Sequence, residues 1–113
     1  MQKLTAVSLR ALAASIALMA LLIMHGNANA ADAQVKIANF TFDPPVLTMK
    51  AGTTVTWVNN DDIPHLVSEK DGKFRSSALD TGDKFSQTFS TAGTVEYFCA
   101  IHPHMTGKIV VEP

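Results

Sequence analysis

The sequence predicts an all-β protein, an antiparallel β-sandwich of seven to eight short strands, and two observations carry this prediction. No stretch of residues 31–113 keeps a helical spacing of apolar residues for long, whereas several short stretches alternate apolar and polar residues as half-buried strands do. Turn-forming glycines separate these stretches, at Gly52, Gly72, Gly82 and Gly93. Short strands joined by turns at this spacing are typical of a sandwich.

Residues 1–30 have the pattern of a secretory signal peptide. Lys3 and Arg10 give a positive start, residues 11–24 form an uncharged apolar run, and small residues up to Ala30 offer a cleavage site. A membrane anchor is the alternative, but the run is shorter than the ~20 apolar residues of a spanning helix. We therefore expect cleavage after Ala30, export to the periplasm without membrane insertion, and a single domain over residues 31–113.

The first half of this domain is expected to supply three strands. Residues 35–42 (VKIANFTF) are rich in β-branched and aromatic residues, which favour strands. Residues 46–49 form the next expected strand, and a strand at 53–59 follows after a tight turn. In that third strand Val55 and Trp57 share one face and threonines occupy the other, which predicts that one face is buried.

The second half is expected to add three more strands. They lie in the stretches KFSQTFSTAG (84–93), TVEYFC (94–99) and KIVVEP (108–113). In the middle stretch Tyr97 and Cys99 fall on the same face, with the cysteine at the end of the strand.

The length and charge of residues 31–113 limit the kinds of binding partner that the domain is expected to have. A domain of this length buries a modest core, so a bound metal would add useful stability. Residues 31–113 carry seven basic and ten acidic side chains, a formal charge of −3. This weakly acidic balance gives no reason to expect binding to nucleic acid or anionic lipid. The acidic loop residues, Asp61 among them, are expected to be solvated charges.

The single cysteine needs an explanation. Exported proteins usually pair their cysteines, but Cys99 is the only cysteine in the chain and cannot pair within it. The alternatives are an intermolecular disulfide, a reactive thiol, a thiolate bound to a metal, or a plain buried thiol that behaves as a small apolar residue.

The neighbours of the cysteine favour the metal. Cys99, His102 and Met105 are spaced Cys-x2-His-x2-Met, at the end of an expected strand and on the loop after it. His65, which follows the conformationally restricted Pro64, is the candidate for a fourth ligand. Thiolate and thioether favour copper, and structural zinc sites do not use methionine. Two histidines, a cysteine and a weak methionine contact are the pattern of a blue-copper electron-transfer site.

At these residues the chain resembles a known family. The stretches GTTVTWVNNDDIPH and FSTAGTVEYFCAIHPHMTGKIVVE are similar to those of the small cupredoxins, the type 1 blue copper proteins. Among these the chain is most like the amicyanins, with plastocyanins and pseudoazurins as relatives, over residues 46–112. The resemblance implies a Greek-key β-sandwich that holds one type 1 copper per chain near one end. It implies ligand roles for His65, Cys99, His102 and Met105.

Three positions depart from the pattern of that family. Leu66 replaces an asparagine whose side chain ties the two ligand loops together, although the Leu66 backbone N–H can still bond the cysteine sulfur. Ile101 and His104 stand where amicyanins have a proline and an aromatic residue. Neighbours on an extended loop point apart, so we expect His104 to face solvent or a partner and not to be a ligand.

The resulting functional hypothesis is a soluble, monomeric electron carrier that cycles one copper between Cu(II) and Cu(I). The resemblance implies redox protein partners, with a c-type cytochrome as the first candidate and a dehydrogenase as the second. The alternative is a periplasmic protein for copper storage, sensing or delivery. An enzyme is not expected: three histidines in residues 31–113 cannot supply a second copper centre as well, and nothing suggests a base and an oxyanion hole for hydrolysis.

Overall fold

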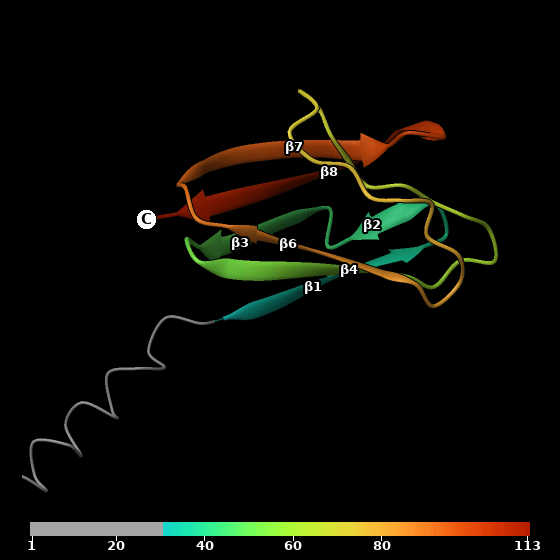
Figure 1. Cartoon of the computed structure of the whole chain (residues 1–113), viewed down its shortest axis with the longest axis horizontal. Coiled ribbons are helices and arrows are strands. Elements are labelled where there is room, and N and C mark those ends of the chain that lie inside the picture. Colours follow the sequence, from blue (N-terminus) through green and yellow to red (C-terminus); the bar gives the residue numbers. More distant parts are fainter. Residues whose placement is uncertain (1–30) are drawn as a thin grey trace, which may run out of the picture.

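The computed structural model describes residues 31–113, and the expected signal peptide lies outside the described residues. Within the described part, eight strands form two four-stranded sheets that pack face to face (Figure 1). This confirms the predicted all-β sandwich. Across residues 31–113 the structure contains no helix with the length and apolar character needed to cross a membrane.

The chain passes repeatedly from one sheet to the other. In chain order the strands are β1 (Asp32–Ala38), β2 (Thr41–Asp43), β3 (Val46–Lys50), β4 (Thr53–Asn59), β5 (Ser68–Glu69), β6 (Lys84–Phe89), β7 (Gly93–Cys99) and β8 (His102–Glu112). One sheet has the order β2-β1-β4-β6 and the other β3-β8-β7-β5. Consecutive strands therefore often lie in different layers, which ties the two sheets together at many points along the chain.

Each sheet contains one parallel pair of strands, which the expected antiparallel arrangement did not include. β1 pairs parallel with β4, and β3 pairs parallel with β8, while the other neighbouring strands are antiparallel. Parallel neighbours need a long crossover connection in place of a hairpin. The crossing through the opposite sheet supplies it, because the chain leaves β1 and β2, forms β3 in the other layer, and returns as β4.

The stretch 35–42 is a hairpin and not the single strand that its composition predicted. β1 ends at Ala38, and the chain turns at Asn39 and Phe40, whose φ angles are +52° and +58°. β2 then runs back along β1, so that Ile37 is paired with Phe42. The left-handed region is uncommon for residues other than glycine, although asparagine tolerates it better than most. Because no glycine occupies this turn, the composition of the stretch did not predict it.

The alternation predicted for β4 is confirmed, and it forms the centre of the core. Val55 and Trp57 are fully buried, while Thr54 and Thr56 lie on the outer face and pair their hydroxyls with side chains of β6 at 2.7 Å. The Trp57 ring is surrounded by four other aromatic rings with centroids 5.3–6.4 Å away, those of Phe74, Phe85, Phe89 and Tyr97. This cluster fixes the distance between the two sheets.

The last strand begins much earlier than expected. β8 starts at His102, after a turn made only of Ala100 and Ile101, and Cys99 is paired with His102 across it. His102 and Met105 therefore lie on a strand and not on the predicted loop. The polar stretch HPHMTG (102–107) lacks apolar alternation, so its sequence did not predict a strand. Its ends, His102 and Thr106–Gly107, pair with β7, and residues 103–105 lie between these pairs without a partner on β7. A register shift between Phe98 and Cys99 accommodates the tight turn.

Candidate metal centre

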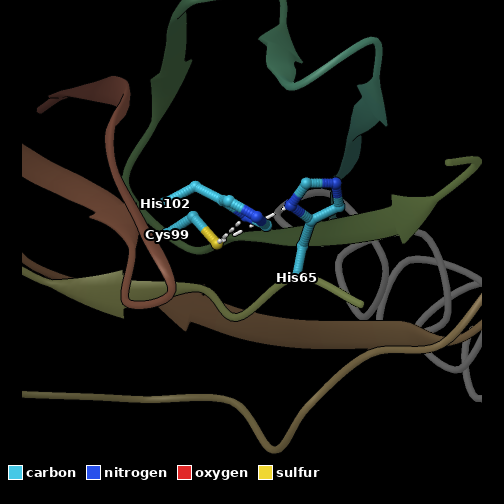
Figure 2. Close-up of side chains that lie close together, drawn as sticks. All are labelled: His65, Cys99 and His102. Carbon is cyan, nitrogen blue, oxygen red and sulfur yellow. Dashed lines mark hydrogen bonds between the residues drawn. The ribbon is translucent and has the colours of Figure 1, made fainter. Parts of the chain in front are cut away.

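The side chains of Cys99, His102 and His65 point toward one another, as Figure 2 shows. The Sγ atom of Cys99 lies 3.6 Å from Nδ1 of His65 and 3.5 Å from Nδ1 of His102. All three donor atoms lie within 4.8 Å of one another, and within residues 31–113 this is the one cluster of histidine, cysteine or acidic side chains with such spacing. The structure thus brings together three of the four residues that the sequence singled out for a metal.

Two of the donors come from one hairpin. Cys99 ends β7 with its side chain fully buried, and His102 opens β8 only three residues later with its side chain partly exposed. Because the intervening turn is so short, both side chains point to the same side of the hairpin. The alternation that placed Tyr97 and Cys99 on the inner face of β7 therefore also sets the position of the sulfur.

The third donor comes from the segment that leaves β4. His65 is fully buried, and its backbone pairs with Leu79 through N–H···O bonds of 3.1 and 2.8 Å. The buried Asn59 side chain braces the same segment, since its amide donates to the backbone oxygens of Ile63 and Leu79 at 2.9 and 2.8 Å. These bonds hold the His65 backbone in place independently of any ion.

Asp61 fixes which nitrogen of His65 faces the sulfur. Nε2 of His65 lies 2.8 Å from Oδ2 of Asp61. Because a carboxylate only accepts hydrogen bonds, this contact requires the proton on Nε2, whose N–H group donates the hydrogen bond. The lone pair of Nδ1 is then free to face Cys99, which is the form a metal ligand needs. Burial works to raise the pKa of Asp61, but hydrogen bonds from the backbone N–H groups of Phe40 and Asn39 and from His65 outweigh it and lower the pKa.

The expectation that Asp61 is a solvated charge was therefore wrong. Its side chain is only 13% exposed, and it bonds the His65 ring as well as two backbone N–H groups. The sequence offered one signal, an aspartate four positions before a candidate ligand. That signal is weak without the fold, because the other contacts of the carboxylate reach residues 21 and 22 positions away.

The cysteine sulfur also accepts a backbone hydrogen bond. The N–H of Leu66 donates to Sγ of Cys99 at 3.3 Å, which is the contact that the resemblance implied would survive the loss of an asparagine at this position. A donor aimed at the sulfur stabilises negative charge on it. This N–H would support the charge of a cysteine sulfur that is bound to a metal.

Met105 and His104 take opposite positions on β8. Met105 is 5% exposed and belongs to the hydrophobic core, whereas the side chain of His104 is exposed and outside the donor cluster, as expected. Met105 lines the same pocket as His102, a surface hollow of about 410 Å³ whose wall also includes Phe40 and Ile101. The thioether is thus buried on the strand that carries His102, three residues further along.

The donor atoms fit a metal ion. Metal–sulfur and metal–nitrogen bonds of ~2.3 and ~2.0 Å, at an angle near the tetrahedral value, place the sulfur and nitrogen about 3.5 Å apart. The two sulfur–nitrogen distances agree with this value. Cys99 has no disulfide partner, and a thiolate with two imidazoles suits copper better than calcium or magnesium. Met105, which lines the same pocket as His102, would add a soft thioether, a ligand that structural zinc sites do not use.

Comparisons with known protein sequences agree with this chemistry. Residues 29–112 match the family described as copper binding proteins, plastocyanin/azurin family. The chain is 39% identical over 90 residues to amicyanin-alpha of Methylorubrum extorquens, a match that covers 75% of this chain and 76% of that protein. It is 40% identical over 83 residues to amicyanin of Paracoccus versutus, with 69% of this chain and 63% of that protein covered.

Solved structures give the same picture of the fold. A purple cupredoxin from Nitrosopumilus maritimus is 36% identical with a TM-score of 0.66, and the match covers 72% of this chain and all of that one. A mutant of amicyanin in its oxidized form is 37% identical with a TM-score of 0.67, over 70% of this chain and 80% of that one. A copper-containing nitrite reductase from Thermus scotoductus is also similar, at 30% identity and a TM-score of 0.68, but the match covers only 22% of that larger chain.

Proposed function

The chain belongs to the plastocyanin/azurin family of copper-binding proteins, and from that premise we propose that it is a soluble periplasmic electron carrier that moves one electron at a time between redox proteins. The observation that carries the proposal is a buried cysteine sulfur with Nδ1 atoms of two histidines at 3.5 and 3.6 Å. The cofactor is copper, and when bound it supplies a one-electron Cu(II)/Cu(I) couple.

The proposed ligands are His65, Cys99 and His102, with Met105 as a weak fourth contact. The burial of Cys99 and His65 excludes water from two of the donors, and the Leu66 N–H supports negative charge on the sulfur. Because the donors are held by strands and by paired backbone, they cannot rearrange far when the charge of the site changes. A small rearrangement is what fast electron exchange requires.

Partners would approach at His102, which is the donor with a partly exposed side chain. Three exposed apolar side chains, those of Phe40, Ile101 and Pro103, line one pocket with it, together with the exposed His104 and the buried Met105. An apolar surface beside the metal suits brief contact with another redox protein. A c-type cytochrome is our first candidate for the partner, and a dehydrogenase is the second.

Copper storage or delivery is the alternative function, and the burial of the donors speaks against it. Delivery needs ligands that an acceptor protein can reach, whereas Cys99 and His65 are both fully buried. An enzymatic role is not proposed. Residues 31–113 contain three histidines, of which His65 and His102 would be used by one copper, which leaves His104 alone for any second centre.

The proposed function has a direct test. We expect the protein to bind one copper per chain, to show an intense visible band, and to oxidise a reduced c-type cytochrome in stopped-flow measurements. The copper-free protein is the control. Rapid loss of Cu(I) to a chelator, without electron exchange, would favour delivery. Weak, pale absorption after copper loading would reject the blue-copper site itself.

Met105→Leu tests the weak contact. We expect the visible band to persist, because the two histidines and the cysteine are unchanged, and the reduction potential to rise, because loss of a sulfur donor disfavours Cu(II) more than Cu(I). The rise would be ~59 mV for each tenfold change in relative affinity. Voltammetry measures it, and Met49→Leu, the same change at a buried methionine on β3, is the control. A lower potential or loss of copper would contradict the proposed contact.

A further inference from the structure

We propose that Asp61 is a positioning residue for the metal centre, because its single carboxylate clamps the His65 ring to the β1–β2 turn and thereby sets the Phe40 ring as a cover over both imidazoles. The metal-centred part of this proposal rests on the proposed ligand roles of His65 and His102. The hydrogen bonds themselves belong to the protein chain and are tested without copper.

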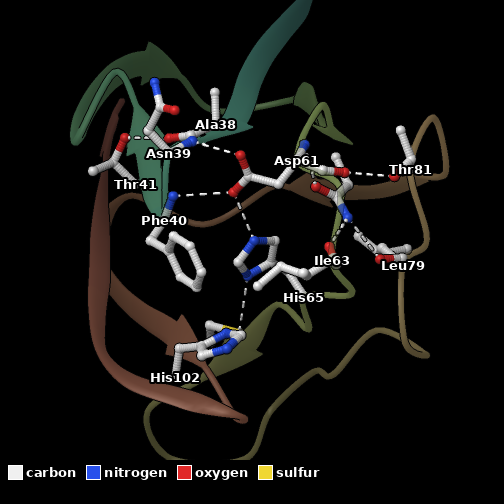
Figure 3. Close-up of polar contacts among 12 residues, drawn as sticks. Ala38, Asn39, Phe40, Thr41, Asp61, Ile63, His65, Leu79, Thr81 and His102 are labelled. Carbon is white, nitrogen blue, oxygen red and sulfur yellow. Dashed lines mark hydrogen bonds and ion pairs between the residues drawn. The ribbon is translucent and has the colours of Figure 1, made fainter.

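The clamp consists of three hydrogen bonds to one carboxylate (Figure 3). Oδ1 of Asp61 accepts the backbone N–H of Asn39 at 2.6 Å, and Oδ2 accepts the backbone N–H of Phe40 at 3.0 Å. Oδ2 also accepts Nε2–H of His65 at 2.8 Å. All three partners are N–H donors, so both oxygens must be acceptors. An asparagine amide would present its own NH₂ group to at least one of these donors, and its neutral oxygen is a weaker acceptor than a carboxylate, so it would weaken the clamp.

The clamping residue is itself held in place. The backbone N–H of Asp61 donates to the Asn59 side-chain oxygen at 2.9 Å, and the Thr81 hydroxyl donates to the Asp61 backbone oxygen. Asn59 is the fully buried last residue of β4, and it also braces the backbone that carries His65. The carboxylate is therefore anchored to the rigid centre of the sandwich.

The turn needs this anchor. Asn39 and Phe40 both have positive φ angles, +52° and +58°, and the left-handed region is unfavourable for residues with a side chain, above all for a bulky one. Such a conformation persists where surrounding contacts compensate for it. The backbone N–H groups of these two strained residues are the two that donate to Asp61.

The strained turn places Phe40 against the donor cluster. The Phe40 ring packs edge-on against both imidazoles, with centroid distances of 5.6 Å to His65 and 5.1 Å to His102 and interplanar angles of 88° and 84°. Phe40 is nevertheless 52% exposed, so its ring lies between the solvent and the two histidines. An exposed aromatic ring in this position limits both the rotation of His102 and the access of water.

The clamp would act on the metal in two ways. It keeps the His65 proton on Nε2, so that Nδ1 is available to a metal, and it places a negative charge behind the imidazole, which makes Nδ1 a stronger donor. A stronger donor and a nearby negative charge stabilise Cu(II) more than Cu(I). The clamp would therefore lower the reduction potential and hold His102 in place through Phe40.

The first experiment uses the copper-free protein. We expect histidine-ring NMR spectra to show His65 protonated at Nε2, with a proton that exchanges slowly with water. In Asp61→Asn the exchange should accelerate at least tenfold and the tautomer should no longer be fixed. Asp62→Asn is the matched control, because it removes the same charge from the exposed neighbouring residue, and it should match the wild type. Equally slow exchange in Asp61→Asn would overturn the proposal.

A folded clamp-free protein can be obtained even if Asp61→Asn does not fold. Adding Asn39→Gly removes the unfavourable left-handed side chain at that position, so the turn depends less on the carboxylate. The double variant should fold and still show rapid exchange of the His65 proton. Slow exchange in this folded double variant would equally reject the clamp.

The second experiment uses the copper-loaded protein and reads spectra and potential. Asp61→Asn should raise the reduction potential relative to Asp62→Asn, and pulsed EPR of Cu(II) should show an altered signal from the remote nitrogen of one imidazole. Phe40→Leu keeps the backbone N–H groups, so the His65 signal should stay unchanged while the His102 ring signals of the Cu(I) protein broaden. Unchanged potential in the first variant, or unchanged His102 signals in the second, would contradict the corresponding half of the proposal.

The two proposals can fail separately. If the wild-type protein gives no intense visible band with copper, the proposed function fails, while the His65 exchange measurement on the copper-free protein still decides whether the clamp exists. If the band appears but Asp61→Asn behaves as Asp62→Asn in both experiments, the electron carrier survives and the clamp is rejected.

Discussion

Replacing Cys99 with serine is expected to abolish the intense visible band of the copper-loaded protein while the sandwich remains folded. The band requires charge transfer from a thiolate, and a serine hydroxyl stays protonated at neutral pH and cannot supply it. The cost to folding should be small, about 1 kcal/mol, because the hydroxyl can accept the Leu66 N–H and donate to one of the two imidazole Nδ1 atoms that now surround the sulfur.

Absorption spectroscopy and thermal unfolding followed by circular dichroism would measure the two effects of Cys99→Ser. Ala100→Ser is the matched control, because it places a hydroxyl on the half-buried neighbouring residue and leaves the thiol intact. The control should keep the band. A band that persisted in Cys99→Ser would mean that the chromophore lies elsewhere, and the proposed ligand set would have to be abandoned.

Gly107→Ala is expected to destabilise the fold strongly although it adds only one methyl group. Gly107 on β8 lies opposite Tyr97 on β7, and a Cβ atom there would overlap the Tyr97 ring, with Cε2 at 2.7 Å and Cζ and the hydroxyl closer still. The ring cannot move away, because it is 2% exposed and packs against Phe42 and Trp57 with centroids 4.7 and 5.3 Å away.

Overpacking of this kind typically costs ~1–3 kcal/mol, and each kcal/mol lowers the melting temperature of a domain of this size by ~4–8 °C. Calorimetry of the copper-free protein measures the effect. A smaller partner provides the control: combining Gly107→Ala with Tyr97→Leu should cost less than the sum of the two single changes, because the shortened side chain leaves room for the methyl group. A melting temperature unchanged by Gly107→Ala alone would show that the strands can separate to admit it.

The sequence predicted best those features that depend on local alternation. The structure confirms the buried face of β4, with Val55 and Trp57, and the inward-facing Tyr97 and Cys99 of β7. Alternate residues of a strand point to the same face, so this pattern holds in any sheet that buries one face. The spacing of Cys99 and His102 was likewise informative, since a short turn keeps their side chains together whether the second lies on a loop or, as found, on a strand.

The features that the sequence did not reveal depend on contacts between distant residues. Nothing local distinguishes the turn at Asn39 and Phe40 from a continuous strand, because its left-handed conformation is supported by a carboxylate more than twenty positions away. Asp61 looked like any other loop charge for the same reason. The start of β8 at His102 depends on the pairing of this residue with Cys99 of β7 and could not be predicted from a stretch without alternation.

The positions of the three donors in the sequence also bear on how copper binding is coupled to folding. Cys99 and His102 are neighbours in one hairpin, whereas His65 lies 34 positions before the cysteine and reaches it only through tertiary structure, next to the pairing of β5 with β7. An ion held by all three would act as a cross-link that closes a long loop, and a disulfide that closes a loop of similar length removes ~3–5 kcal/mol of chain entropy from the unfolded state. An early two-donor complex on the hairpin could capture copper before folding is complete, and the arrival of His65 would then lock the metal and the tertiary structure in a single step.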